Sequence, residues 1–134
     1  MRNQIIVNSF QTLIESETYG SILYFVLGGL LLLAAFHLVM FLQNRNKSYL
    51  LYSIYAFFSF LAYLPVAENG FMVHLSEFFG LDSASKIFFT FSFNCIYFFF
   101  FAQFLDIKNI NRTWYKIITL PVLILLTLNI LTYL

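Results

Sequence analysis

Few residues of this sequence could do chemistry, and most of those lie within long apolar stretches. His37 is the first candidate, because an ionisable side chain inside a membrane-like segment marks a functional site by default. It also stands about one and a half helical turns from a polar turn at 43–47, close to where a membrane interface would lie. We therefore interpret His37 first as a packing or hydrogen-bonding residue and second as a functional group.

Three further polar residues occur in an apolar stretch later in the chain. Thr90 and Asn94 are four residues apart, so a helix would present them on one face, and Gln103 follows near the end of the same stretch. Hydrogen bonds between membrane helices, worth about 0.6 kcal/mol each, are the ordinary explanation for such residues. A ligand or ion path is the alternative that this pattern leaves open.

No residue pattern here is typical of catalysis or of cofactor binding. His74 and Glu77, with Glu68 nearby, could supply metal ligands, but so few residues are more typical of the solvated face of a helix. The sequence contains no phosphate-binding G-x-x-x-x-G-K-S/T loop, no paired-cysteine motif, no H-E-x-x-H and no G-x-S-x-G. We expect no enzymatic activity, no metal, no cofactor and no nucleic-acid partner, and the pattern identifies no ligand.

The composition explains why polar residues are so scarce. Of 134 residues, 61% are hydrophobic and 10% are charged, whereas soluble domains carry about 25% charged residues. Such a chain is an integral membrane protein, so the lipid bilayer is its first partner. The one cysteine, Cys95, lies in an apolar run and has no partner for an intrachain disulfide.

Apolar runs long enough to cross a bilayer position these residues. We predict an all-α, polytopic membrane fold with four transmembrane helices, at 20–42, 48–66, 84–105 and 114–134. The lead at 1–18 is expected to be a partly ordered tail, with an amphipathic surface helix as the alternative. An amphipathic segment in the second loop, 71–80, predicts a short helix in the membrane interface that stops at Gly80.

Polar residues beside and within the spans predict how the helices begin and pack. Asp82 or Ser83 is expected to cap the third span, and Thr113 the fourth. One face of the second span is smaller and more polar than the opposite face, so it should point into the bundle; it consists of Tyr52, Ala56, Ser59 and Tyr63.

A stripe of small residues on the first span predicts a helix contact. Ser21, Gly28 and Ala35 recur every seven residues, which places them on one face of a helix. Small side chains let another helix backbone approach closely. We expect this stripe to meet another membrane helix, from a copy of this chain or from a signalling partner.

The charges predict the orientation of the chain. When the loops alternate between the two sides, five cations share one side: Arg45, Lys47, Lys108, Arg112 and Lys116. The other side receives two cations, Arg2 and Lys86, together with five of the acidic residues. By the positive-inside rule the first side is cytoplasmic. We expect a multi-pass protein of the cytoplasmic (inner) membrane with both termini extracytoplasmic.

The junction between the first two spans carries a family resemblance. The first span follows a Gly and ends in a pattern like "yHl-lf", a short basic turn comes next, and "sYl-y" opens the second span. The third span ends in an aromatic run and "FL-i". The residues concerned are Tyr19 and Gly20; Phe36, His37, Leu38, Met40 and Phe41; Asn44, Arg45, Asn46 and Lys47; Ser48, Tyr49, Leu50 and Tyr52; and Phe104, Leu105, Asp106 and Ile107. Over residues 19–134 the chain resembles the membrane module of bacterial seven-transmembrane receptors with diverse intracellular signalling modules.

The resemblance implies a sensor module in a bacterial inner membrane. Members of that family usually have a periplasmic domain before the first span, seven spans and a cytoplasmic output domain, so we expect this chain to be a truncated or split version. No catalytic residues carry over. Two alternatives stay open: a small four-helix transporter, which the lack of Asp or Glu within the spans disfavours, and a structural membrane subunit.

Overall fold

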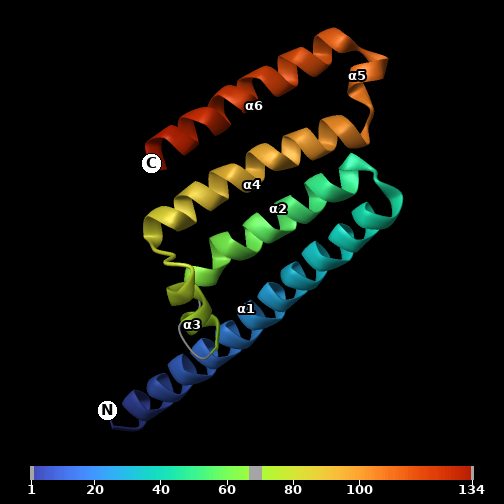
Figure 1. Ribbon diagram of the computed structural model, residues 1–134. Coiled ribbons are helices and arrows are strands. Elements are labelled where there is room, and N and C mark those ends of the chain that lie inside the picture. Colours follow the sequence, from blue (N-terminus) through green and yellow to red (C-terminus); the bar gives the residue numbers. More distant parts are fainter. Residues whose placement is uncertain (1, 67–70, 134) are drawn as a thin grey trace.

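The structure, a computed structural model, describes the backbone of residues 2–66 and 71–133, and side chains from Gly20 onward apart from Ser83. All the regular elements within these ranges are helical. In chain order they are α1 (Arg2–Asn44), α2 (Lys47–Tyr63), the 3₁₀ turn η1 (Leu64–Val66), α3 (Phe71–Phe78), α4 (Ser83–Phe104), α5 (Ile107–Ile110) and α6 (Arg112–Tyr133), as Figure 1 shows.

Four of these helices contain segments long and apolar enough to cross a membrane: Gly20–Asn44, Lys47–Val66, Ala84–Phe104 and Arg112–Tyr133. The predicted all-α fold with four transmembrane helices is confirmed. A short helix, α3, does occupy the second loop, and its placement in the membrane interface stays a prediction. The lead differs from the expected partly ordered tail, because α1 begins at Arg2 and continues without a break into the first span.

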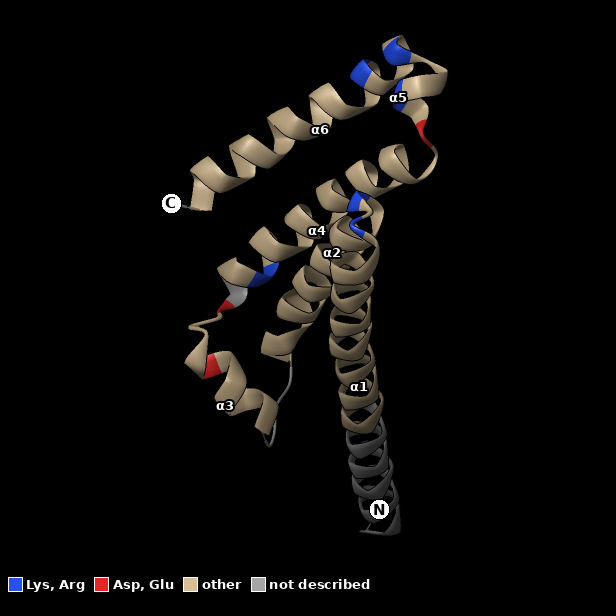
Figure 2. Cartoon of the chain, turned by 45° about the vertical axis from the view of Figure 1, so that its right-hand side comes forward, with Lys and Arg blue, Asp and Glu red and all other residues tan. Residues whose placement is uncertain are grey.

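The four long helices form an open layer. Extensive contacts join α1 to α2, α2 to α4, and α4 to α6. In Figures 1 and 2, α1 and α6 stand at opposite edges of this row, with α2 and α4 between them. Each helix runs antiparallel to the next because the connections are short. Two faces of the layer are therefore open to lipid or to partner helices.

A cluster of buried residues lies where α3 meets the middle of α1 and the end of α2. Leu27 of α1 joins Phe60, Leu61 and Leu64, all buried, and Met72 of α3 packs against this cluster. The polar face expected on α2 is buried at Ala56 and Ser59, while Tyr63 is exposed. Leu61 and Leu64, on the opposite side, are buried as well, because α2 is a middle helix that packs against neighbours on both sides.

The turn between α1 and α2 is held by two local devices. Arg45 has a φ of 56°, a left-handed conformation that is costly for a residue with a Cβ, and its N–H donates to the carbonyl of Phe41 at 2.7 Å. Asn46 then caps α2, its side chain accepting from the N–H of Ser48 at 2.9 Å. Two residues therefore reverse the chain, and the basic turn is rigidly placed.

The structure confirms some of the other predicted helix ends and contradicts one of them. Gly80, at a φ of 62°, and Leu81 close a hydrogen-bonded stop after α3, with the Leu81 N–H reaching the carbonyl of Ser76 at 3.0 Å. Asp82 caps α4, as expected. The prediction for α6 is wrong: the side-chain oxygen of Asn111, not that of Thr113, accepts from the first N–H groups. The third loop also contains the unexpected one-turn helix α5.

Candidate functional site

His37 takes part in an aromatic cluster that joins three helices. Its ring lies on that of Tyr52 from α2, with centroids 4.1 Å apart, and near Tyr49 at 6.3 Å. Tyr52 in turn meets Phe100 of α4 at 5.4 Å in an edge-on contact, and Phe100 stacks on Phe104. We call these five residues the His37 cluster. Aromatic pairs of this kind contribute about 0.5–1.5 kcal/mol each beyond their buried area.

The His37 cluster surrounds a hollow at one face of the layer. The hollow has a volume of about 260 Å³ and is lined by the five cluster residues and Ser48. The Nδ1 atom of His37 lies 2.8 Å from the carbonyl oxygen of Leu33. Because that oxygen can only accept, Nδ1 donates, and the neutral ring keeps Nε2 as an acceptor. The structure therefore supports both interpretations of His37: it is packed and hydrogen-bonded, and it still has one free acceptor beside a cavity.

The ring contacts continue along α2 and α4 beyond the hollow. Tyr55 meets Phe93 at 5.8 Å and Tyr97 at 5.6 Å. In these contacts between α2 and α4, α2 therefore contributes tyrosine rings and α4 contributes phenylalanine or tyrosine rings. These ring contacts extend the α2–α4 interface beyond the hollow.

A separate polar seam holds α4 to α6, and the sequence analysis missed it. The Asn129 amide donates to the Phe88 carbonyl and to the Ser92 hydroxyl, both at 3.0 Å. Tyr133 shares a 2.8 Å hydrogen bond with Ser85, and its ring stacks on Phe88 at 4.3 Å. The spacing of these residues was the available signal. Ser85 and Ser92 are seven residues apart in the phenylalanine-rich α4, and Asn129 and Tyr133 are four apart in α6, so each pair lies on one helix face.

The same seam includes Asp82 at the end of the layer. Its carboxylate accepts from the N–H and the hydroxyl of Ser85, both at 2.8 Å. The Ser85 backbone N–H, and after it the Ser85 hydroxyl, lower the pKa of Asp82 below the ordinary carboxyl value. A charged carboxylate at this helix N-terminus also suits the helix dipole.

The other predicted intramembrane residues do not join this site. The amide of Asn94 donates to the Thr90 carbonyl at 2.7 Å, and the Thr90 hydroxyl donates to the Lys86 carbonyl, so both bonds stay within α4. The expectation of hydrogen bonds between helices is wrong for these two residues, because their side chains lie on an outer face. Gln103 is exposed and lines a different hollow, beside Arg45 and Lys47.

The small-residue stripe of α1 is exposed, and its member Ala35 lies at the edge of a groove between α1 and α2. Ser21, Gly28 and Ala35 are exposed, and a Cβ added to Gly28 would meet nothing within 4 Å. The adjacent register faces α2 instead: Leu27 and Ala34 are buried, and the Ser53 hydroxyl donates to the Ala34 carbonyl at 2.7 Å. A helix contact at the stripe stays a prediction.

The charges are segregated in space. Figure 2 shows lysines and arginines gathered at the end where α1 stops and α6 starts. This end holds the predicted topology determinants, which are Arg45, Lys47, Lys108, Arg112 and Lys116. The opposite end holds Lys86 with Asp82 and an exposed pair, His74 and Glu77, whose nearest atoms are 3.6 Å apart. Within the described residues no three His, Cys, Asp or Glu side chains gather as metal ligands, and Glu68 lies outside them.

Comparison with known proteins gives one match. A family model described as 7TM diverse intracellular signalling matches residues 19–134. No curated protein and no solved structure matches the chain. The match begins at the residue before the first span and covers all four spans, the His37 cluster and the polar seam.

Proposed function

Because the chain belongs to the 7TM diverse intracellular signalling family, we propose that it is a non-enzymatic sensor module that carries a signal across a bacterial inner membrane. The observation that carries this proposal is the His37 cluster, in which rings from α1, α2 and α4 pack around one hollow. A ligand that enters this hollow contacts those rings directly, and we propose that it moves them. Such a movement shifts three helices together, which is an established way to pass a signal through a membrane.

The proposed orientation follows from the charges. Five of the cations lie at one end of the layer, and this end is assigned to the cytoplasm by the positive-inside rule. The proposed route for the signal is a rearrangement of the helices. The proposed recipient is another membrane protein that packs on the open layer, and the exposed stripe of Ser21, Gly28 and Ala35 offers one contact for it.

The orientation can be tested with single-cysteine variants. Cys95→Ala provides the background, and Lys47→Cys, Lys108→Cys and Lys86→Cys each add one reactive thiol. A membrane-impermeant maleimide applied to intact cells should label only the Lys86 variant. Labelling of the Lys47 and Lys108 variants instead would reverse the proposed topology.

The signalling role is tested in the source organism by deletion and complementation. We expect deletion to change the transcription of a defined set of genes, and the wild-type chain to restore it. A His37→Leu/Tyr52→Leu double variant, present in the membrane at the same level, should fail to restore it. The matched control is Phe25→Leu/Leu32→Ala, which alters two lipid-exposed residues of α1 outside the cluster and should restore transcription fully.

Two results would count against the signalling role. If deletion changed the accumulation of a solute and left transcription unaltered, the chain would be a transporter. If deletion instead abolished the membrane assembly of another protein, and the cluster variant still restored it, the chain would be a structural subunit.

A further inference from the structure

A hollow with a cationic rim lies at the turn between α1 and α2. It has a volume of about 350 Å³ and is lined by Phe41, Arg45, Lys47, Leu50, Leu51 and Gln103. Its floor is apolar, while two positive charges and a carboxamide stand at its edge. Neither Arg45 nor Lys47 has an acidic partner among the residues that the structure describes. The two charges are therefore available to an anion that approaches from outside.

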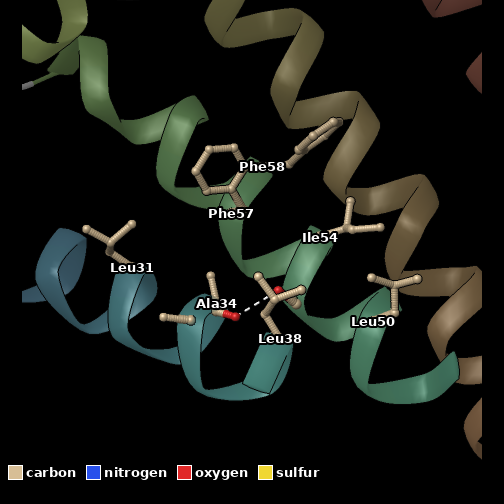
Figure 3. A pocket seen from close by; sticks show the side chains of 9 residues that line it. Leu31, Ala34, Leu38, Leu50, Ile54, Phe57 and Phe58 are labelled. Atoms are coloured by element: carbon tan, nitrogen blue, oxygen red, sulfur yellow. Dashed lines mark hydrogen bonds between the residues drawn. The ribbon is translucent and has the colours of Figure 1, made fainter. Parts of the chain in front are cut away.

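This hollow continues into an apolar groove between the two helices. Leu50 lines both the hollow and a second cavity of about 400 Å³, which Leu31, Ala35, Ile54 and Phe57 line farther along. Figure 3 shows the side chains of Leu31, Leu50, Ile54 and Phe57 around the groove. The groove's one polar side chain, Ser53, already donates its hydroxyl to the carbonyl of Ala34. The groove therefore fits an occupant that is apolar along its whole length.

The length of the combined site matches one leaflet of a bilayer. From Lys47 to Phe57 is ten residues, which corresponds to about 15 Å along a helix. The hydrocarbon core of a bilayer is about 30 Å thick, so one leaflet spans about half of it. Charge is confined to the outer end of the site and apolar side chains line the rest.

We propose that this site binds one anionic phospholipid, with its phosphate on Arg45 and Lys47 and an acyl chain in the α1–α2 groove. Charge complementarity selects this occupant. An apolar helix in the groove would offer no negative charge to the two cations, whereas a lipid with a net negative headgroup offsets them. A zwitterionic lipid fits the groove equally well but offers less net charge to the rim. The proposal does not depend on the signalling role.

Native mass spectrometry of the purified full chain in a mild detergent tests the proposal. The chain is titrated with phosphatidylglycerol or with phosphatidylcholine of the same acyl chains. We expect phosphatidylglycerol to bind more tightly. Removing both charges with Arg45→Gln/Lys47→Gln should weaken phosphatidylglycerol binding roughly 30-fold, since each cation near a membrane surface contributes about a factor of five.

Two matched variants separate the rim from the groove. Lys108→Gln/Arg112→Gln removes the same charge from the same end of the layer and should leave phosphatidylglycerol binding unchanged. Ala35→Phe fills the groove and should weaken both lipids without altering the preference between them. Retained helix content by circular dichroism shows that each variant is folded.

Three outcomes would overturn the proposal. Equal losses in the rim variant and its matched control would make the effect one of overall charge. Binding of soluble glycerol phosphate at the affinity of the lipid would make the rim a free-anion site. A dimer that Ala35→Phe dissociates, with no lipid bound, would assign the groove to a second copy of the chain.

Discussion

The polar seam between α4 and α6 gives the sharpest quantitative prediction. Among its described residues, α6 buries a single side chain, Val122, so little apolar packing holds this helix to the layer. The Asn129 amide supplies two hydrogen bonds to α4. At about 0.6 kcal/mol for each hydrogen bond between membrane helices, Asn129→Leu should lower the free energy of unfolding by about 1.2 kcal/mol.

A second variant divides the seam into its parts. Tyr133→Phe removes the hydrogen bond to Ser85 and keeps the ring on Phe88, so it should cost about 0.6 kcal/mol. Asn129 and Tyr133 are one helical turn apart and act on the same helix pair. We therefore expect the double variant to depart from the sum of the two losses, because contacting residues couple.

The assay uses a reporter that the chain already contains. Trp114 is the single tryptophan and stands at the start of α6, 59% exposed. Unfolding from mild-detergent micelles by increasing dodecyl sulfate is followed through its fluorescence. The matched control is Asn94→Leu, the same substitution at an exposed residue whose amide bonds only its own helix; it should not destabilise the chain. Equal losses in Asn94→Leu and Asn129→Leu would refute the reasoning.

Three further predictions concern single contacts. Ser53→Ala removes the hydrogen bond to the Ala34 carbonyl and should lower the free energy of unfolding by about 0.6 kcal/mol in the same titration, whereas the exposed substitution Thr127→Ala should not. Arg45→Gly should raise the free energy of unfolding by about 0.5 kcal/mol, because glycine accepts the positive φ without a Cβ clash, although its greater freedom in the unfolded chain offsets part of the gain; a loss of stability would show that the turn needs the arginine side chain. Because the pKa of Asp82 is lowered on folding, its contribution is fully present above the ordinary carboxyl value and is lost as the pH falls through the folded pKa; the unfolding midpoint of the wild type should therefore fall in the acid range below about pH 4, and Asp82→Asn should flatten that fall.

Hydropathy and capping residues were enough to predict the four spans and the short helix α3, but not α5 or the extension of α1 to Arg2. Four apolar runs predicted four spans, since a run of such length has few other stable environments. Gly80 and Asp82 predicted one helix stop and one helix start correctly, because these signals act within a single turn. Asn111 and Thr113 are two residues apart and both are good caps, so sequence alone could not choose between them.

The sequence did not predict which face of each helix packs against which neighbouring helix. Ala34 and Ala35 are equally small and adjacent, yet one faces α2 and the other is exposed. A rotation of about 100° about the helix axis separates them. In a helix that is apolar on all sides, hydropathy does not distinguish the face that packs from the face that is exposed. The polar seam was missed for the same reason, because its residues come from two helices, α4 and α6, whose pairing the sequence did not specify.

The position of α2 links the His37 hollow to the proposed lipid site. Tyr49 and Tyr52 face the His37 hollow on one side of α2, while Lys47, Leu50 and Ile54 face the lipid groove on the other. A rotation of α2 that opens one cavity must therefore change the lining of the other. An occupant of the groove that favours one rotation of α2 changes the affinity of the His37 hollow for its own occupant. By linkage, the occupant of the His37 hollow changes the affinity of the groove by the same factor. We therefore expect the proposed lipid at the Arg45–Lys47 rim to change how strongly the proposed sensor responds, with α2 as the element that both sites bias.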